Sequence, residues 1–252
     1  MRKHILKLYI VTCLVLALVQ SSLGATGQTG DHQPMTAAVL LPQGGTHDLS
    51  GRVVRCEPEQ RVGIWAESHV PLTIANAVIE GCEVGVMVTG GTTTADTLDL
   101  AVEGQARQLQ GIQVLAANIG IWLAGNGGTV KSNIVGGAKY GFVVTGDDYI
   151  IMGNRSNDNL HDGFLITGDR NVLEGNEALR NRGIGIHVAS MAPVVGKRRA
   201  LFFLQERALG NVIQKNTALE NARDDVVEFS EHCDDNEWAD NMFRTRRPWC
   251  LK

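Results

Sequence analysis

A histidine and an aspartate stand next to each other at His161 and Asp162, and Arg182 follows about one repeat later. A carboxylate beside an imidazole can orient it as a general base, and a guanidinium can neutralise the carboxylate of a sugar acid. These three residues are therefore the candidate catalytic set. The chemistry they suggest is abstraction of the C5 proton of a uronic acid.

Two Gly-Asp turns place further carboxylates at equivalent positions of successive repeats. Asp147 and Asp148 belong to the first turn, and Asp169 and Arg170 belong to the second. Stacked one repeat apart, the carboxylates could bind Ca²⁺ or contact sugar hydroxyls. Gly-Asp is also ordinary turn chemistry, so a purely structural role stays open.

The elements that carry these residues are short strands in a repeat of about 22 residues. Segments of the form Gly-apolar-x-apolar recur at steps of 22, 35, 21, 22, 22 and 40 residues, and the two long steps equal one repeat plus insertions of 13 and 18. The anchor residues are Gly63, Gly85, Gly120, Gly141, Gly163, Gly185 and Asp225. One such unit cannot bury its apolar side alone, so we expect coils, or rungs, stacked about 4.8 Å apart around a shared interior.

Strand alternation sends the residues one and three positions after each anchor inward, and the residue two positions after it outward. The first inward column is Ile64, Val86, Ile121, Phe142, Phe164, Ile186 and Val226. The outward column is Trp65, Met87, Trp122, Val143, Leu165, His187 and Val227.

This outward column is too apolar to face water along its whole length. Either the insertion at 189–209 covers it, or a saccharide stacks on Trp65 and Trp122. His187 shares the column with Met87, which keeps a metal-binding interpretation open. The seven histidines otherwise contain no close pair, and we assign no metal site and no cofactor, with Ca²⁺ as the one candidate ion.

In-register stacking also aligns asparagines. Asn133, Asn154, Asn176 and Asn216 fall in one column, and Asn159, Asn181 and Asn221 fall in another. Stacked amides can hydrogen-bond along a column while they satisfy turn backbone, so we interpret them as structural.

On these Gly-anchored strands and Asn-x-x-x-x-Asn spacings, the chain resembles the right-handed parallel β-helix proteins with pectate-lyase-like (PbH1) repeats, in their exported branch. The resemblance implies an all-β, single-domain solenoid of about seven rungs. Residues 62–243 would form the β-helix, 25–61 an N-terminal segment and cap, and 244–252 a tail closed by Cys250. The alginate C5-epimerases of this family carry a Tyr-Gly-x-Asp-Pro-His signature, of which this chain keeps only Tyr140-Gly141.

The N-terminus has the features of an export signal. Three basic residues precede and flank an apolar run at 8–18, and small residues stand before Ala25, which predicts a signal peptide over 1–24 and no membrane span. The protein is therefore expected to be secreted or periplasmic. Four cysteines lie outside the predicted signal peptide. In such a compartment they predict two disulfides, Cys56–Cys82 and Cys233–Cys250, with zinc ligation as the alternative.

The charge of the mature chain is acidic. Without Arg2, Lys3 and Lys7 it holds 20 Lys and Arg against 27 Asp and Glu, a formal charge of −7. This balance argues against a nucleic-acid partner or an anionic membrane surface. The charge balance does not indicate the oligomeric state.

Three classes of function remain. The leading hypothesis is a carbohydrate-binding or envelope-glycan-binding solenoid, which would use Trp65, Trp122, Asp147, Asp148, Asp169, Arg170 and His187. The second is a polysaccharide lyase, hydrolase or C5-epimerase. The third is a structural or protein-binding solenoid, including a periplasmic factor that matures a metalloenzyme. Fold alone does not choose among them.

Overall fold

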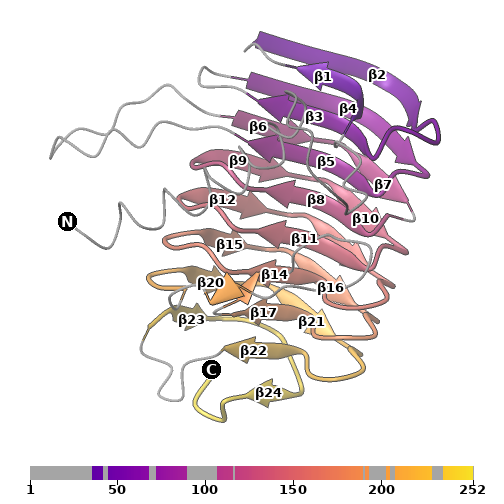
Figure 1. Cartoon of the computed structure of the whole chain (residues 1–252). Coiled ribbons are helices and arrows are strands. Elements are labelled where there is room, and N and C mark those ends of the chain that lie inside the picture. The colour runs from indigo at the N-terminus through magenta and orange to yellow at the C-terminus, as the bar shows by residue number, and fades with distance from the viewer. Residues whose placement is uncertain are drawn as a thin grey trace, which may run out of the picture.

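The computed structural model describes residues 36–41, 45–67, 72–89, 107–115, 117–189, 191–192, 203–204, 208–228 and 235–251. These residues contain β-strands and no helix. The coils stack along one axis from the N-terminal to the C-terminal strands (Figure 1). The protein is thus a right-handed parallel β-helix of about seven rungs, as the repeat predicts. The predicted signal peptide lies outside the described residues.

Each complete rung contributes one strand to a nine-stranded parallel sheet and two to a thirteen-stranded assembly. The nine-stranded sheet runs β1 (Ala37–Leu41), β3 (Val62–Glu67), β5 (Val84–Thr89), β8 (Ile119–Leu123), β11 (Tyr140–Val144), β14 (Phe164–Ile166), β17 (Ile186–Val188), β22 (Val226–Glu228) and β24 (Arg246–Arg247). Strands β1 and β24 extend the parallel pairing beyond both ends of the predicted repeat.

The thirteen-stranded assembly forms two faces that join at the long strand β4 (Leu72–Glu80), which also pairs with β2 (Gly45–Arg55). One face contains β6 (Arg107–Gln110), β9 (Gly128–Lys131), β12 (Tyr149–Met152), β15 (Val172–Glu174), β20 (Val212–Gln214) and β23 (Glu237–Ala239). The other contains β7 (Gln113–Leu115), β10 (Ile134–Gly136), β13 (Arg155–Asn157), β16 (Glu177–Leu179) and β21 (Thr217–Leu219). Strands β18 (Met191–Ala192) and β19 (Phe203–Leu204) form a separate antiparallel pair.

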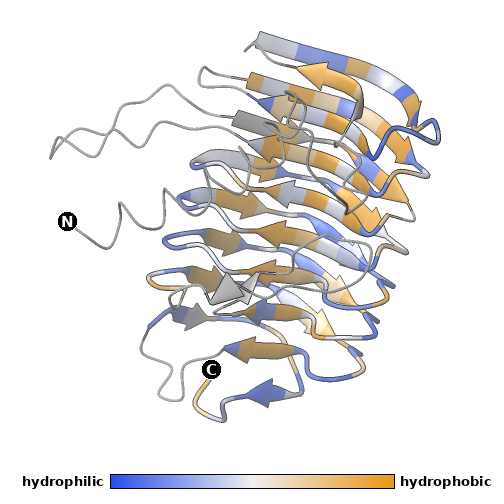
Figure 2. Ribbon diagram, in the orientation of Figure 1, coloured by the Kyte–Doolittle hydropathy of each residue, from blue (hydrophilic) through white to orange (hydrophobic). Residues whose placement is uncertain are grey.

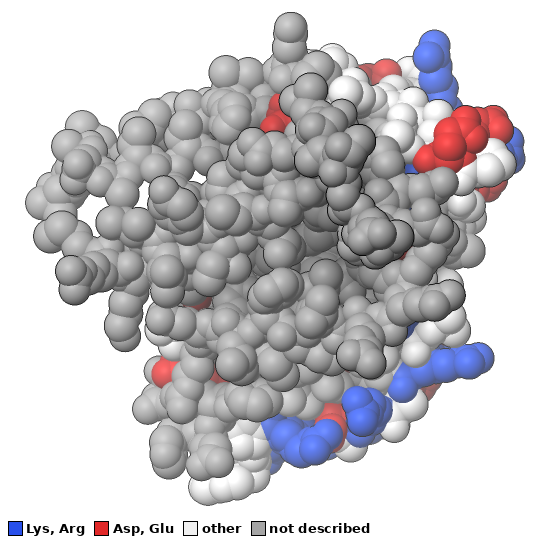
Figure 3. Space-filling view, viewed as in Figure 1, with Lys and Arg blue, Asp and Glu red and all other residues white. Residues whose placement is uncertain are grey.

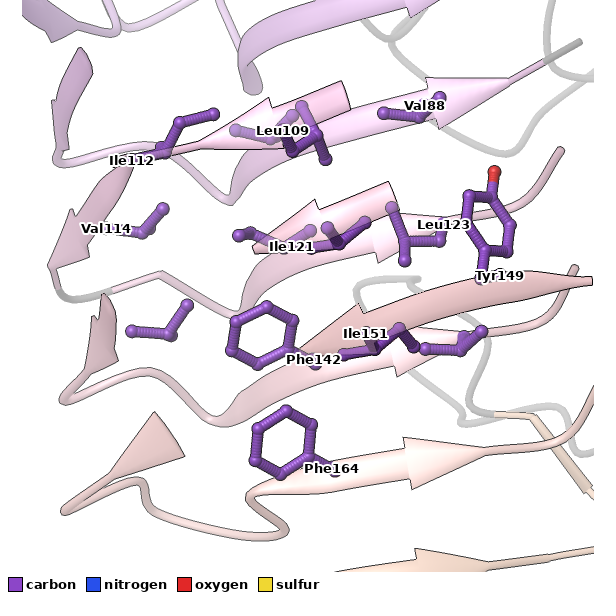
Figure 4. Close-up of a cluster of buried hydrophobic side chains, with 14 of the residues drawn as sticks. Val88, Leu109, Ile112, Val114, Ile121, Leu123, Phe142, Tyr149, Ile151 and Phe164 are labelled. Carbon is purple, nitrogen blue, oxygen red and sulfur yellow. The ribbon is translucent and has the colours of Figure 1, made fainter. Parts of the chain in front are cut away.

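The interior is a continuous apolar column. All seven residues of the first inward column are fully buried, which confirms the predicted alternation. Phe142 and Phe164 stack with ring centroids 4.7 Å apart, and neighbouring aliphatic side chains fill the space between the sheets (Figure 4). Most strands carry hydrophobic segments, and many of the turns between them are hydrophilic, whereas β24 at the C-terminal end is hydrophilic (Figure 2).

The anchor glycines are required where successive rungs approach most closely. A Cβ atom on each would lie only 2.5 to 2.7 Å from the carbonyl oxygen of the next anchor, from Gly63 through Gly185. Asp225 ends the series, and its carboxylate accepts hydrogen bonds from the backbone N–H groups of Arg244 and Thr245. A side chain is therefore tolerated only at the last anchor.

Buried amides join the rungs as predicted, in two columns. Each side-chain oxygen accepts the backbone N–H of the asparagine one rung before it, from Asn133 to Asn241 and from Asn159 to Asn221. A third column of Asn171, Asn211 and Asn236, which the sequence analysis missed, does the same at the turn before the second sheet face. The asparagines thus satisfy the buried turn backbone of most rungs.

The N-terminal end is closed by the predicted Cys56–Cys82 disulfide, with a Cα–Cα distance of 5.2 Å. Cys250 is also disulfide-bonded, while its predicted partner Cys233 lies outside the described residues. Acidic and basic side chains lie close together near both ends of the stack (Figure 3), where ion pairs join Arg55 to Glu80 and Arg247 to Asp224.

The apolar outward column is buried over much of its length. Met87, Val143 and Leu165 are at most 4% exposed, although they point away from the interior. The predicted cover, 189–209, is described only in small part.

Replacing Asn176 with Ala should lower the free energy of unfolding by about 3 kcal/mol, because it leaves the buried N–H of Asn154 and the carbonyl of Ile151 unpaired. Asn241→Ala is the matched control, since Asn241 ends the same column and is only partly buried. Urea unfolding of both variants measures the difference. Equal losses would contradict the importance of the buried ladder.

Asp225→Asn should cost about 2 kcal/mol near neutral pH. One carboxylate oxygen accepts the backbone N–H groups of Arg244 and Thr245 and the other accepts the backbone and side-chain N–H groups of Asn221, whereas an amide has only one acceptor oxygen. Burial opposes ionisation, but these hydrogen bonds hold the pKa of Asp225 below its usual value. Its contribution is therefore present above the unfolded-state pKa of about 3.9 and lost as the pH falls through the folded-state pKa. The unfolding free energies of the variant and the unchanged protein should begin to approach each other as the pH falls below about 3.9 and should converge only below the folded-state pKa of Asp225. The exposed control Asp240→Asn should show little effect at any pH.

Candidate functional site

Four polar or aromatic residues meet on the outer side of the nine-stranded sheet. Tyr140 and Asp162 immediately precede the anchors Gly141 and Gly163, and the N–H of Gly141 donates to the carbonyl of Asp162. His161 lies beside Asp162 in the turn after β13, and His187 is the central residue of β17, one rung further on. Parallel stacking thus brings residues from three rungs together.

Asp162 is the centre of this cluster and is only 1% exposed. One carboxylate oxygen lies 2.9 Å from Nδ1 of His161, and the other lies 2.9 Å from Nδ1 of His187. The backbone N–H of Ile184 donates to the first oxygen at 2.9 Å. A single buried carboxylate therefore holds two imidazole rings.

The electrostatics of the cluster favour an ionised aspartate. Burial tends to raise the pKa of the Asp162 carboxyl, but the hydrogen bonds of His161 and His187, the charge of His187 and the Ile184 N–H together hold it well below its usual range. The pKa of Tyr140 is raised by its own burial and by the negative charge of Asp162. The tyrosine ring packs against His161 with centroids 4.7 Å apart.

An ionised carboxylate can only accept hydrogen bonds, so Nδ1 of both histidines must donate. In a neutral imidazole this leaves the lone pair on Nε2. The side chains of His161 and His187 are 38% and 21% exposed, so both rings are partly open to solvent. The cluster therefore offers two oriented nitrogen atoms, each able to bind a metal ion or accept a proton.

The sequence analysis predicted that His161 and Asp162 act as a pair, and the two side chains are in contact. It did not predict that His187 contacts Asp162 or that Tyr140 packs against His161. Strand alternation gave no signal for these contacts, because the position before an anchor and the position two after it are three residues apart and would fall on opposite faces. In the structure, residues at both positions pack together in one cluster outside the main core. Arg182 is exposed, and among the described residues no hydrogen bond or ion pair joins its side chain to His161 or Asp162. Its predicted role with them stays untested.

The predicted acidic turn is held together internally. Arg170 forms a two-pronged ion pair with Asp148 at 2.8 Å and lies 3.6 Å from Asp147. Asp147 and Asp169 also accept backbone N–H groups from Asp169 and Leu209 respectively. These contacts join successive rungs. Calcium binding at this turn remains a prediction.

The two outward tryptophans are likewise engaged with the next rung. The indole N–H of Trp65 donates to Thr89, and that of Trp122 donates to Thr145. Met87 is paired with both tryptophans and is buried between them.

Met87 and His187 lie four register steps apart in the outward column. Four rung spacings amount to about 19 Å, too far for one metal ion. Within the described ranges, no group of three or more His, Cys, Asp or Glu side chains is arranged as a metal cage.

Fold and cluster together define an exported parallel β-helix repeat protein with two histidines held by one buried aspartate on its outer side. A family model described as periplasmic copper-binding protein (NosD) matches residues 58–247, about three quarters of the chain. The chain belongs to the NosD family. Membership in a periplasmic family agrees with the predicted export, and no helix among the described residues is long and apolar enough to cross a membrane. A search of curated proteins gave no match.

The tautomers of the two histidines provide a direct test of the cluster. Long-range ¹⁵N–¹H correlation spectra at alkaline pH should show the proton on Nδ1 of both His161 and His187, because both donate to Asp162. In Asp162→Asn at least one ring should change to the Nε2–H form, since an amide nitrogen cannot accept. Two Nε2–H rings in the unchanged protein would contradict the geometry.

Proposed function

We propose that this protein binds copper in the periplasm, with Nε2 of His161 and Nε2 of His187 as ligands. The observation that carries the proposal is the carboxylate of Asp162, which holds both rings by Nδ1. Metal-bound histidines usually donate their second ring N–H to such a carboxylate, which orients the ring and makes the ligand nitrogen more basic. The description of the matching family supports the same metal.

The donor atoms suit this ion. Neutral imidazole is a good copper ligand. Both rings are partly exposed to solvent. The buried carboxylate of Asp162 contacts each ring and fixes its orientation. Asp162 itself acts as an outer-shell residue, since its oxygens are occupied by the two rings and by Ile184. Copper when bound would be cargo held by the protein, which is compatible with a role in maturing a periplasmic metalloenzyme.

Glycan binding finds weaker support. A sugar stacks best on an open aromatic face, whereas Trp65 and Trp122 flank the buried Met87 and donate their indole N–H groups to threonines. The carbohydrate hypothesis would need a different part of the surface or a rearrangement of this column.

A second candidate function uses the same cluster for proton transfer. Nε2 of His161 is backed by a buried carboxylate, as in a general base, and Tyr140 packs against the ring. A lyase or epimerase acting on an acidic polysaccharide could use His161 in this arrangement as its general base. Unsaturated products or changed uronate epimers, lost in His161→Ala, would establish it.

The copper proposal is tested by metal competition. His161→Ala and His187→Ala should each weaken copper binding at least about tenfold, and Asp162→Asn should weaken it about 10- to 100-fold. Affinity is measured by titration of the purified mature protein against a chromophoric copper chelator.

His47→Ala is the matched control, because Nε2 of His47 is buried and outside the cluster. It should bind copper as the unchanged protein does. Retention of full affinity in a His161→Ala, His187→Ala double variant would rule the proposed site out.

A further inference from the structure

We infer that two copies of this protein associate side by side and antiparallel, along the edge of the β-helix formed by the turns that precede the anchors. We call this edge the anchor corner. Its described turns are residues 56–62, 81–84, 117–119, 137–140, 158–162, 180–184, 220–224 and 240–244. The partner that this surface fits is a second copy of the chain, because the corner carries opposite charges at its two ends. The inference does not depend on the copper proposal.

The C-terminal half of the anchor corner is basic. Lys139, Arg182, Arg223 and Arg244 lie one to three residues before the anchor positions of four different rungs, and all four are exposed. The backbone N–H groups of Arg182 and Arg223 donate to carbonyl groups of the preceding rung, so these turns stack on one another. None of the four side chains forms an ion pair with another described residue.

Other basic side chains of the stack are neutralised within the chain. They form ion pairs with carboxylates of a neighbouring rung, namely Arg55–Glu80, Arg61–Glu83, Arg155–Glu177, Arg170–Asp148, Arg180–Asp158, Lys215–Glu174 and Arg247–Asp224. In the C-terminal half of the corner, Glu220 and Asp240 are the exposed carboxylates outside these pairs, as far as the structure describes it. Positive charge therefore remains in excess there.

The N-terminal half of the anchor corner is acidic. Glu57 and Glu59 are both exposed, and neither carboxylate is ion-paired within the described ranges. Glu83, in the next rung, is already paired with Arg61. Acidic side chains are grouped near the N-terminal end of the stack, at the right of the view, and basic side chains predominate near its C-terminal end (Figure 3). The corner thus has a negative end and a positive end.

An antiparallel pair of copies brings these opposite ends together. A two-fold axis perpendicular to the stack makes both copies use the same surface, so that the first rung of one copy faces the last rung of the other. Seven strand pairings separate the rung of Glu59 from the rung of Arg244, a length of about 34 Å. In this arrangement Glu59 faces Arg244 of the second copy, and this contact occurs twice.

The middle of the corner offers an apolar contact. Leu160 lies one rung after Lys139, near the centre of the edge, and is 53% exposed. The two-fold axis would pass close to it, so the leucines of both copies would lose water-exposed surface on association. Contacts between exposed charges are individually weak and are screened by salt. We therefore expect a reversible, salt-sensitive dimer.

The experiment is sedimentation equilibrium of the mature protein at two ionic strengths. The dissociation constant of the dimer should rise at least about tenfold between about 0.05 M and about 0.5 M NaCl, because salt screens the facing charges. Reversal of one charge, in Glu59→Arg or in Arg244→Glu, should weaken dimerisation at least about tenfold, since like charges then face each other.

The combined variant, Glu59→Arg with Arg244→Glu, tests the antiparallel register. It should recover most of the affinity, because opposite charges face each other again. Lys131→Glu is the matched control: Lys131 lies in β9, outside the corner, and has no ion pair with a described residue. This variant should dimerise as the unchanged protein does.

Three results would overturn the inference. A protein that stays monomeric at low ionic strength forms no such dimer, and its basic half is then free for a different acidic partner. A dimer that neither single reversal weakens uses another surface. A combined variant that fails to recover shows that the two ends do not face each other.

Discussion

The structure depends on how closely successive rungs approach at the anchor positions. There the carbonyl oxygen of one rung occupies the space in which a Cβ atom of the previous rung would lie. This contact permits the parallel strands to pair directly above one another at the ordinary strand spacing of about 4.8 Å. It excludes every side chain except at the final anchor, Asp225, where the carboxylate instead closes the stack.

The buried asparagines are a consequence of this close spacing. Turns between rungs leave backbone N–H groups inside the molecule, where water cannot reach them, and an unpaired buried N–H is costly. Each amide oxygen accepts the backbone N–H of the asparagine in the rung before it, and each amide N–H group donates to a backbone carbonyl of that preceding rung and to the amide oxygen of the next asparagine. The ladders therefore fix register as well as stability, because a slip of one residue would break every amide in the column.

Register in turn creates the candidate site. Asp162 and His187 come from different rungs and different positions relative to their anchors, yet both point outward and meet across one strand spacing. The backbone N–H of Ile184 also donates to the carboxylate of Asp162, so that one oxygen faces each ring. These hydrogen bonds explain why the proposed ligands are oriented before any ion arrives, which reduces the entropic cost of binding.

Much of this architecture was predictable from the chain alone, because it depends on local rules repeated many times. The anchors, the inward column, two asparagine columns and the Cys56–Cys82 disulfide all follow from spacing and alternation. The third amide column was missed because Asn171 is its one member before the 40-residue step, and the residue one rung earlier is Tyr149. The joining of His161, Asp162 and His187, the engagement of the tryptophans by threonines, and the separation of Met87 from His187 were decided only by tertiary structure. Periodicity fixes which face a residue occupies, but the contacts among side chains on that face depend on how adjacent rungs align and on which turns lean toward each other.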